Sequence, residues 1–441
     1  MKQITATEYL ITAGIGFLVG LRLLGASLGL FYMAAGGACI YFAFRNDHFR
    51  LFTVLPYVVF TEVFIRNGAG VTYVPYLFVE YLLIGVFVIM LLSKGGSLKL
   101  HSRCALPIFL YAIVEILDMI RAHDITYARS MVTNTIVLTA MAMWASANTL
   151  SPRLTAHIIK HLALAAVYLS GNILVAHFTH EITYMLVSSS ESTNRMAPVQ
   201  ISGYLGIGSS MIFLYIMNEK YKQAFIVHLF AFTVIVTLMV LTFSRGGIYF
   251  LAGVIALYAL FNRKEVGRFA ILLFLVPIGY IIYYYAMNAT DGKLEQRYVE
   301  KGDSGRTELV EAGFTLFLDE PLAGVGTGNY GSEILNRNLY GVESGAHNEF
   351  VRAAAEHGIL GIIFYWGFYA ILIFEFMQRK KQQRDMAFYL LLLFSLIIVH
   401  NGLKIAAQPY ILTIAIATPT LIRRTKKKQI EFKQYIPAPT A

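Results

Sequence analysis

The stretch AFIVHLFAFTVIVTLMVLTF, residues 224–243, decides the fold class. It contains no Asp, Glu, Lys or Arg, and it is long enough to cross a bilayer core, which takes about 20 apolar residues in an α-helix. We therefore predict a transmembrane helix here.

The rest of the chain repeats this pattern. Of its 441 residues, 57% are hydrophobic and 14% are charged, whereas an average soluble protein has about 25% charged residues. The apolar blocks are too long for barrel strands and lack their alternation, and the first block has no features of a cleavable signal. The blocks fall at approximately 9–21, 24–44, 51–65, 75–93, 104–120, 130–148, 160–178, 198–218, 224–243, 248–261, 269–287, 357–376, 386–403 and 405–422. They predict an all-α polytopic membrane protein with roughly 12–14 transmembrane helices, because the shorter blocks can be half-helices or re-entrant segments.

The basic residues predict how the chain is oriented. The formal net charge of +10 comes from clusters between the blocks, such as 379–384 and 423–428. This distribution is typical of cytoplasmic loops and not of a nucleic-acid-binding stripe, so we expect membrane lipids and no nucleic acid as partners. We expect a multi-pass protein of the bacterial inner membrane with both termini in the cytoplasm. The loops at about 66–74, 121–129, 179–197, 244–247, 288–356 and 403–405 then face the periplasm.

The segment 288–356 is by far the longest one between the blocks, and we expect it to form one large periplasmic loop. Long ordered loops are usually functional. From Arg306 to Leu318 its apolar residues recur at helical spacing, which predicts a short amphipathic helix at the membrane surface. These apolar residues are Leu309, Ala312, Phe314, Leu316 and Phe317.

The motif Ser244-Arg245-Gly246-Gly247 places an arginine between two apolar blocks at the predicted periplasmic surface. A charge in such a place usually has an anionic partner, and a guanidinium suits bidentate contacts with phosphate. The alternative is an arginine that snorkels to the surface beside glycines in a tight turn between helices. We favour phosphate binding.

The long loop holds a second motif, Gly305-Arg306 followed by Gly324-Val325-Gly326-Thr327-Gly328. Glycines let the backbone approach a ligand closely, or they simply allow positive φ angles in a loop. No predicted strand precedes these glycines and no acidic residue follows in register, so they do not form a dinucleotide fingerprint.

A third motif, His347-Asn348, lies where the long loop enters the next membrane helix, and Gly358 and Gly361 follow it. An imidazole with a pKa near 6.5 can take a proton from a hydroxyl nucleophile at neutral pH, although a lone histidine is often only a hydrogen-bonded structural residue. The paired glycines would let the helix pack closely against a neighbour. The nearest carboxylates in the sequence are those of Glu343, Glu349 and Glu356.

Charges inside the apolar blocks leave a second class of function open. Glu62, Glu80, Glu115 and Asp118 lie within predicted spans, and the last two share a helical face. They can pair with basic residues or line a lipid path. Transporters and flippases usually place ionisable residues near the bilayer midplane. The other candidates cluster at one surface, so we place a transporter or flippase behind an enzyme.

The order and spacing of the three motifs resemble a known family. His347-Asn348, nine residues and then Gly358-x-x-Gly361 match the signature of the bacterial O-antigen ligases. Residues 244–247 and the segment from Gly305-Arg306 to Gly324-Val325-Gly326 look like the other two landmarks of the O-antigen ligase and polymerase superfamily. The resemblance covers about 190–405, the expected catalytic region, within a chain expected to be a single membrane domain over 1–441.

This resemblance implies an all-helical membrane glycosyltransferase. Such enzymes take a glycan from an undecaprenyl diphosphate carrier on the periplasmic side, with neither nucleotide sugar nor metal. The acceptor is a sugar hydroxyl of the lipid A core in the ligases, and the terminal sugar of another carrier-linked repeat in the polymerases of O-antigen or exopolysaccharide. No cofactor is expected, and the sequence has neither an Asp-rich metal motif nor a CxxC spacing at Cys39 or Cys104.

The resemblance also implies roles for single residues. Carried over by position, Arg245 and Arg306 are expected to bind the diphosphate, with Arg195 as a third contact in a segment that matches only loosely. His347 is expected to act as base on the acceptor hydroxyl, and direct attack would invert the anomeric centre. The acidic helper is left open: Glu343 or Glu349 orients the histidine or serves as base instead.

A second His-Asn pair, His400-Asn401, lies at another predicted periplasmic helix end, near Lys404 and Gln408. It either lines the same cavity or satisfies carbonyl groups at the end of its helix. We favour the second interpretation.

Overall fold

The computed structural model describes residues 4–20, 25–65, 74–93, 100–179, 198–218, 222–263, 266–299 and 305–417. Over these ranges the chain is helical and forms no strand, which confirms the prediction of an all-α polytopic membrane protein. Arg195 lies outside the described residues, so its expected contact with phosphate stays a prediction.

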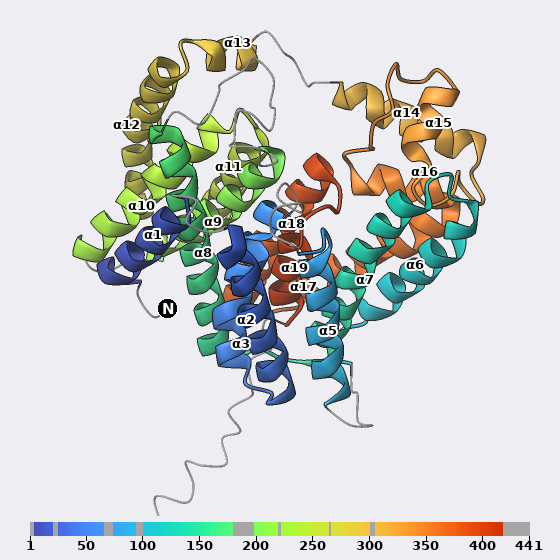
Figure 1. Ribbon diagram of the computed structural model, residues 1–441, viewed down its shortest axis with the longest axis horizontal. Coiled ribbons are helices and arrows are strands. Elements are labelled where there is room, and N and C mark those ends of the chain that lie inside the picture. Colours follow the sequence, from blue (N-terminus) through green and yellow to red (C-terminus); the bar gives the residue numbers. More distant parts are fainter. Residues whose placement is uncertain are drawn as a thin grey trace, which may run out of the picture.

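Each predicted apolar block coincides with a helix, and further helices occupy the long loop (Figure 1). The helices are α1 Ala6–Gly20, α2 Gly25–Phe44, α3 His48–Phe60, α5 Phe78–Leu92, α6 Ala105–Asp118, α7 Ile125–Ala147, α8 Pro152–Phe178, α9 Pro198–Asn218, α10 Lys222–Leu241, α11 Gly246–Phe261, α12 Val266–Ala289, α13 Lys293–Val299, α14 Arg306–Asp319, α15 Tyr330–Asn336, α16 Glu349–Gly361, α17 Gly367–Met377, α18 Lys381–Asn401 and α19 Ala407–Ala417. A 3₁₀ turn, η1 Met119–Arg121, follows α6, and a π-helical turn, η3 Ile362–Trp366, joins α16 to α17.

Among the described residues, 6 helices are long and apolar enough to cross a membrane by themselves. They are His48–Ile65, Pro152–Val175, Pro198–Met217, Ala224–Leu241, Glu349–Met377 and Gln383–Asn401. Shorter apolar helices, among them α5, α11 and α19, accompany them. The expected 12–14 spans therefore include helices shorter than a full crossing, which burial within the bundle tolerates.

Local sequence explains where several helices begin. Asp124 precedes α7, and its carboxylate accepts hydrogen bonds from the backbone N–H groups of Thr126 and Tyr127 at 2.8 and 3.1 Å. Ser151 precedes α8 and accepts one from Leu154 at 3.2 Å, with Pro152 in the first turn. Such side chains satisfy N–H groups that have no partner within the helix.

The bundle is built around α8 and α9. Helix α8 packs against α1, α3 and α9, while α9 also contacts α10 and α11. Helices α18 and α19 lie in the middle of the molecule in Figure 1 and pack against each other, while α18 contacts α11 and α19 contacts α7. One large apolar core runs through these helices.

Helices α14, α15 and the first turns of α16 form a separate lobe above α6 and α7 in Figure 1. The lobe has a small apolar core of its own. The predicted amphipathic helix is present as α14, and Leu309, Ala312 and Leu316 lie in that core. Phe314 and Leu318, by contrast, are 43% and 73% exposed. The buried face of α14 is therefore taken up by α15 and α16, and the expected position of this helix at a membrane surface stays a prediction.

Helix α16 begins inside the segment that was expected to be a loop. It starts at Glu349, although the apolar block predicted only residues from 357. The reason is that its first turns carry Glu349, Arg352, Glu356 and His357, which are all buried and paired, so that a hydropathy criterion misses them. The predicted loop 288–356 accordingly ends in helix at its C-terminal side.

The loops predicted to share one side of the membrane meet one another. Arg121, after α6, donates to the carbonyl of Gly324 at 2.8 Å, and the amide of Leu403 donates to Glu349 at 3.0 Å. Arg306 at the start of α14 contacts His400 at the end of α18. Candidate residues that are far apart in the sequence are thus brought to one end of the bundle.

Glycines bring α1 and α8 into close contact. A Cβ on Gly16 would lie 2.1 Å from the carbonyl oxygen of Tyr168, and one on Gly171 would lie 2.5 Å from that of Ala13. Gly14, on the same helix, has nothing within 4 Å of such an atom. Only small residues allow helices in membrane proteins to approach this closely.

We predict that Gly16→Leu separates α1 from α8 and lowers stability by about 1–3 kcal/mol, the usual range for overpacking. Gly14→Leu adds the same side chain to the same helix and is expected to change stability little. The thermal unfolding midpoints of the two variants in detergent check this. Equal midpoints would show that the close approach of α1 to α8 contributes nothing.

Candidate active site

The motif 244–247 forms the turn between α10 and α11, with Arg245 half-buried just before α11. Ser202 of α9 holds this turn: its hydroxyl donates to the carbonyl of Ser244 at 3.0 Å and accepts from the amide of Gly247 at 2.9 Å. A Cβ on Gly247 would lie 2.2 Å from the carbonyl oxygen of Ser202. The second glycine is therefore required for packing against α9, and Arg245 is fixed on a rigid turn.

The first glycine of this motif makes room for a histidine. A Cβ on Gly246 would lie 2.6 Å from Cδ2 of His400. The His400 ring also meets the rings of Tyr249 and Phe250 edge to face, with centroids 6.0 and 5.9 Å away. The guanidinium of Arg306 donates to Nδ1 of His400. His400 therefore joins the first motif to the second.

Arg306 is the first residue of α14, and Gly305 before it has a φ of 78°. A side chain would be strained in that conformation. A Cβ on Gly305 would also lie 2.2 Å from the hydroxyl of Tyr340. The Gly-Arg pair therefore begins α14. The backbone conformation at position 305 requires glycine, and the side chain of Arg306 points to His400.

His347 adopts a φ of 50°, which is uncommon for a residue other than glycine. Backbone strain of this kind concentrates at functional sites. Asn348 is the N-cap of α16, and its Oδ1 accepts from the amide of Phe350 at 3.0 Å. Among the described residues, Nδ1 of His347 is buried without a hydrogen-bond partner. The Asn of the motif thus starts the helix, and the His is held beside it.

Two cations lie near His347. Burial, together with the charges of Lys404 and Arg306, lowers the pKa of His347 to about 4. Lys404 comes from the turn between α18 and α19, and a Cβ on Gly345 would lie 3.1 Å from its Nζ. Gln408 holds that turn, since its Oε1 accepts from the amides of Lys404 and Ile405 at 2.8 and 3.0 Å. At neutral pH the imidazole of His347 is uncharged and able to accept a proton.

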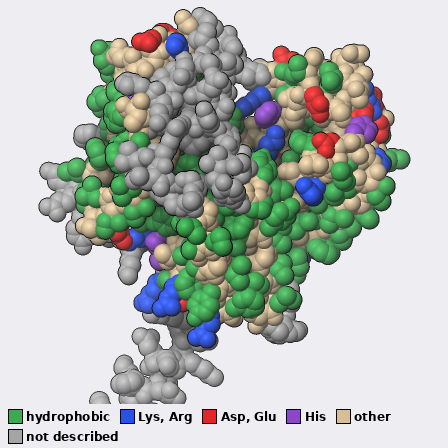
Figure 2. Space-filling model, in the orientation of Figure 1, with side chains coloured by type: hydrophobic (Ala, Val, Ile, Leu, Met, Phe, Trp, Pro, Cys, Tyr) green, Lys and Arg blue, Asp and Glu red, His purple; other side chains and the backbone are tan. Residues whose placement is uncertain are grey.

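We call Arg245, Arg306, His347, His400 and Lys404 the cationic cluster. They come from four separate segments, and the charges of the two arginines and the lysine act on the two histidines. Figure 2 shows basic and histidine side chains gathered in a recess beside the lobe of α14, α15 and α16. Guanidinium and ammonium groups around one space suit an anion such as a diphosphate, and a neutral imidazole in the same place suits proton transfer.

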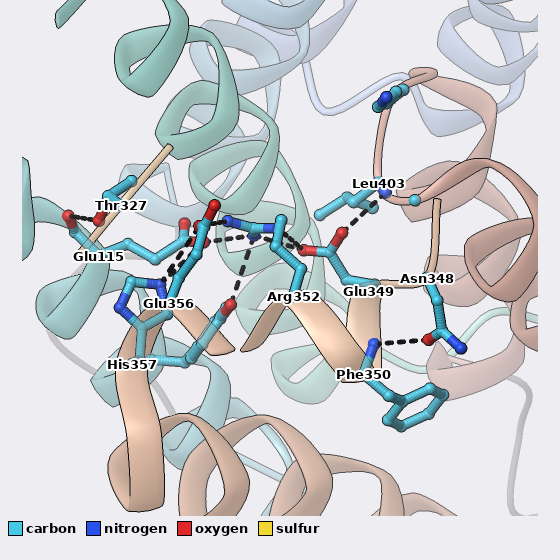
Figure 3. A network of polar contacts seen from close by, with 12 residues as sticks. Glu115, Thr327, Asn348, Glu349, Phe350, Arg352, Glu356, His357 and Leu403 are labelled. Carbon is cyan, nitrogen blue, oxygen red and sulfur yellow. Dashed lines mark hydrogen bonds and ion pairs between the residues drawn. The ribbon is translucent and has the colours of Figure 1, made fainter. Parts of the chain in front are cut away.

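A second polar network lies behind this cluster, around Arg352 (Figure 3). Arg352 donates to Glu356 at 2.7 Å and to Glu349 at 2.9 Å, and it also contacts Glu115 of α6. These three carboxylates and Arg352 are buried. Charges in such a place are stable only when they are paired and hydrogen-bonded. Helix α16 is therefore joined to α6 by ion pairs and not by apolar contacts alone.

The network continues to the glycine-rich loop. Nδ1 of His357 lies 2.7 Å from Oδ2 of Asp118. The other carboxylate oxygen of Asp118, Oδ1, accepts a hydrogen bond from Arg121 at 2.8 Å. Arg121 donates to the carbonyl of Gly324 at 2.8 Å. Among the described residues, no group of three or more His, Cys, Asp or Glu side chains is arranged to hold a metal ion. The acidic network is thus a set of ion pairs.

The glycines of the second motif approach a helix backbone. A Cβ on Gly324 would lie 2.4 Å from the carbonyl carbon of Glu356, and the amide of Gly326 donates to the carbonyl oxygen of Glu356 at 2.9 Å. Val325 donates in the same way to Ala355 at 2.9 Å. Gly324, Gly326 and Gly328 have φ values of 64°, 94° and 77°, so the interpretation as a loop with positive φ angles is confirmed. The loop also approaches α16 closely and satisfies its carbonyl groups, while approach to a ligand stays a prediction.

The paired glycines after His347 shape α16 itself. Gly358 has a φ of 58° and a ψ of −139°, which kinks the helix. A Cβ on Gly358 would lie 2.6 Å from the carbonyl oxygen of Pro321, and one on Gly361 would lie 1.8 Å from that of Ala353. The close packing expected of these glycines is found against the loop at Pro321 and against the preceding turns of α16.

The two acidic candidates lie differently from His347. Glu349 binds Arg352 and accepts from the amide of Leu403 at 3.0 Å, so its carboxylate holds the turn that carries Lys404. Glu343 is exposed, and its Cγ would lie 3.1 Å from a Cβ on Gly331 of α15. Which of the two assists the histidine stays a prediction.

Several residues of the site were not recognised as such in the sequence. His400 was assigned to helix-end capping, but it lies in the cationic cluster beside Arg306, and Lys404 lies there too. Arg352 and His357 were not singled out, although they are the partners of Glu115 and Asp118. The signal that could have found them is that Arg352 and His357 lie with Glu349 and Glu356 on the polar side of the helix over 349–357. Glu62 is also engaged, because it accepts from Tyr204 at 2.5 Å and from the amide of Ala406 at 2.8 Å.

Comparison with known families agrees with this geometry. Residues 229–366 match the family model described as O-antigen ligase. This range contains Arg245, Arg306 and His347 but ends before His400 and Lys404. The match confirms the resemblance to the O-antigen ligase superfamily. No curated protein and no solved structure matches the chain.

We predict that Arg352→Ala lowers the free energy of unfolding by about 3–5 kcal/mol, because it leaves buried carboxylates without a cation. Arg337 is a matched control: it also binds three carboxylates, those of Asp319, Glu320 and Glu333, but its side chain is 29% exposed. We expect Arg337→Ala to cost about 1 kcal/mol. Thermal unfolding in detergent measures both.

A second variant separates charge from packing at Arg352. Adding Glu356→Gln to Arg352→Ala removes one uncompensated carboxylate and is expected to recover part of the lost stability. A double variant no more stable than the single one would mean that Arg352 acts only by filling space.

Proposed function

We propose that this O-antigen ligase-like protein is a membrane glycosyltransferase that moves a glycan from undecaprenyl diphosphate to a sugar hydroxyl of an acceptor. The observation that carries the proposal is the cationic cluster, which brings Arg245, Arg306 and His347 together with His400 and Lys404 inside and beside the region of the family match. The family implies lipid-linked glycan and lipid A-core substrates in general.

The donor's diphosphate is assigned to Arg245 and Arg306. As the bond between the glycan and the diphosphate breaks, negative charge grows on the leaving oxygen, and fixed cations stabilise that charge. Arg306 also stands at the N-terminus of α14, where the helix dipole favours an anion. His400 accepts from Arg306 and rests on Gly246, so it positions that guanidinium toward the first motif. This set of cations supplies without a metal the charge that a metal ion supplies in other transferases.

The base is assigned to His347. Its neutral imidazole takes the proton of the acceptor hydroxyl while the hydroxyl oxygen forms a bond to the anomeric carbon. The bond from that carbon to the diphosphate oxygen breaks, and its electron pair leaves with undecaprenyl diphosphate. Because the acceptor attacks from the side opposite the leaving group, the anomeric centre is inverted.

The acidic candidates keep supporting roles in this proposal. Glu349 already binds Arg352 and the amide of Leu403, which favours positioning of the turn at Lys404 over proton transfer. Glu343 is exposed in the loop before His347 and is the candidate for orienting it in the presence of substrates.

The cellular setting follows from the loop charges. Both termini are placed in the cytoplasm and the cationic cluster in the periplasm, across a bacterial inner membrane. We favour a ligase that acts on the lipid A core over a polymerase of O-antigen or exopolysaccharide repeats, because the His-Asn motif fits the ligase signature.

We predict that Arg306→Ala and His347→Ala each reduce the release of undecaprenyl diphosphate by about 100-fold or more, the range for loss of a charge-stabilising or proton-transferring group. The assay is incubation of the purified protein with its carrier-linked glycan and acceptor, without metal or nucleotide. Glycan on the lipid A core indicates a ligase, and a ladder of carrier-linked repeats indicates a polymerase.

Arg50→Ala is the control for that assay. Arg50 lies in the first turn of α3 beside Asp47, its side chain is 72% exposed, and it is expected to leave release unchanged. Release of undecaprenyl diphosphate at the wild-type rate in both the Arg306 and His347 variants would contradict the assignment of the site.

We also predict the pH dependence of the reaction. Because the pKa of His347 is lowered to about 4, the base is neutral at all higher pH, and kcat/KM falls only as the pH drops through about 4. An unperturbed histidine would lose activity near pH 6.5. Lys404→Met removes a neighbouring positive charge, which raises the pKa of His347 and shifts the fall to higher pH. A fall centred near 6.5 in the wild type, unmoved by Lys404→Met, contradicts the assignment.

A further inference from the structure

A surface pocket lies between the start of α5, the start of α7 and α9, next to the cationic cluster. Its volume is about 650 Å³, within the range of about 300–1,000 Å³ typical of small-molecule sites. We infer that this pocket binds the acceptor saccharide of the transfer. The inference rests on the proposed function and adds to it the place where the acceptor binds.

The first reason is the aromatic lining. Tyr76 and Tyr81 border the pocket, and they are 45% and 48% exposed. A tyrosine offers an apolar ring face with a polar hydroxyl at its end. A pyranose ring has the matching character, because its C–H groups form apolar faces and its hydroxyls form a polar edge. Exposed tyrosines around one pocket therefore suit a sugar better than a lipid chain.

The second reason is the set of hydrogen-bonding groups. Arg129, Asn134 and Gln200 line the same pocket. Oε1 of Gln200 is buried, and among the described residues it has no hydrogen-bond partner. A buried acceptor without a donor carries a free-energy cost until a donor reaches it. A sugar hydroxyl is such a donor, and it can also accept from the Arg129 and Asn134 side chains.

The third reason is the position beside the proposed base. Lys404 belongs to the pocket wall, and its charge acts on His347. Tyr127 also lines the pocket, and its hydroxyl would lie 3.5 Å from a Cβ on Gly345, two positions before the histidine. The wall of the pocket is therefore continuous with the loop that carries His347.

The pocket meets the cationic cluster at Lys404, and Arg245 and Arg306 are not among its lining residues. Arg306 meets His400 beside Gly246, whereas Lys404 lies beside Gly345 and the pocket. His347, the proposed base, has two charged neighbours: Arg306, which contacts His400, and Lys404, which lines the pocket. The pocket therefore reaches the proposed base from Lys404, where an acceptor hydroxyl could approach His347 without occupying the place of the two arginines.

The test compares Tyr81→Ala and Gln200→Ala with wild type in the full-length protein, and Tyr41→Ala is the control. Tyr41 of α2 is 58% exposed and is not part of the pocket. Transfer is measured at varied acceptor with saturating donor, and at varied donor with saturating acceptor. We expect the KM for the acceptor to rise about tenfold in both pocket variants, which corresponds to the loss of one good contact. We expect kcat and the KM for the donor to stay within about twofold, and Tyr41→Ala to behave as wild type.

Two kinetic outcomes overturn the inference. A rise in the KM for the donor alone assigns the pocket to the donor glycan. Unchanged KM values in both pocket variants, with an active wild type, show that no substrate sugar binds there.

A direct measurement keeps this inference distinct from the proposed function. The probe is the lipid-free oligosaccharide released by mild acid from the envelope glycolipid of the source bacterium, and binding is followed by saturation-transfer NMR. If the wild type transfers nothing, the proposed reaction fails. Binding of the probe that is lost in Tyr81→Ala still supports a saccharide pocket in that case, and absence of binding overturns it.

Discussion

The ion pairs of the buried Arg352 are the interaction on which the rest of the site depends. This guanidinium joins Glu349 and Glu356 of its own helix to Glu115 of α6. Glu349 in turn accepts from the amide of Leu403, next to Lys404. The same network therefore fixes both α16, which His347 and Asn348 precede, and the turn between α18 and α19. Because a buried charge tolerates no missing partner, the relative positions of these segments are set within narrow limits.

The arrangement also separates the two signs of charge. Carboxylates close to a phosphate site would repel the donor, yet Glu115, Glu349 and Glu356 lie only a short way from the cationic cluster. Arg352 pairs with all three, and Arg121 pairs with Asp118, which also contacts His357. A cluster of cations is itself destabilising, and such strain is typical of sites that bind an anion.

Backbone strain is found at the same place. His347, which precedes Asn348, has a φ of 50°. Phe243, which precedes the motif 244–247, has a φ of 58°. Such conformations persist only where surrounding contacts enforce them. The N-cap at Asn348 and the Ser202 bridge to the α10–α11 turn supply these contacts. The glycines at 246, 305 and 324 let His400, Tyr340 and α16 approach the backbone. The residues of the three motifs therefore serve close packing as well as the proposed chemistry.

The sequence by itself determined the fold class, because apolar blocks long enough for a bilayer have few alternatives to helix. It also predicted which loops share a side, since basic clusters mark the other side, and it supplied Arg245, Arg306 and His347 as candidates through their motifs. Only the tertiary structure showed which residues these candidates and the buried charges contact. The start of α16 was hidden by charges whose partners lie on α6, and His400 could be separated from a helix cap only by seeing it against Gly246 and Arg306. Hydropathy and spacing act along the chain, whereas ion pairs and close packing join residues that only the fold brings together.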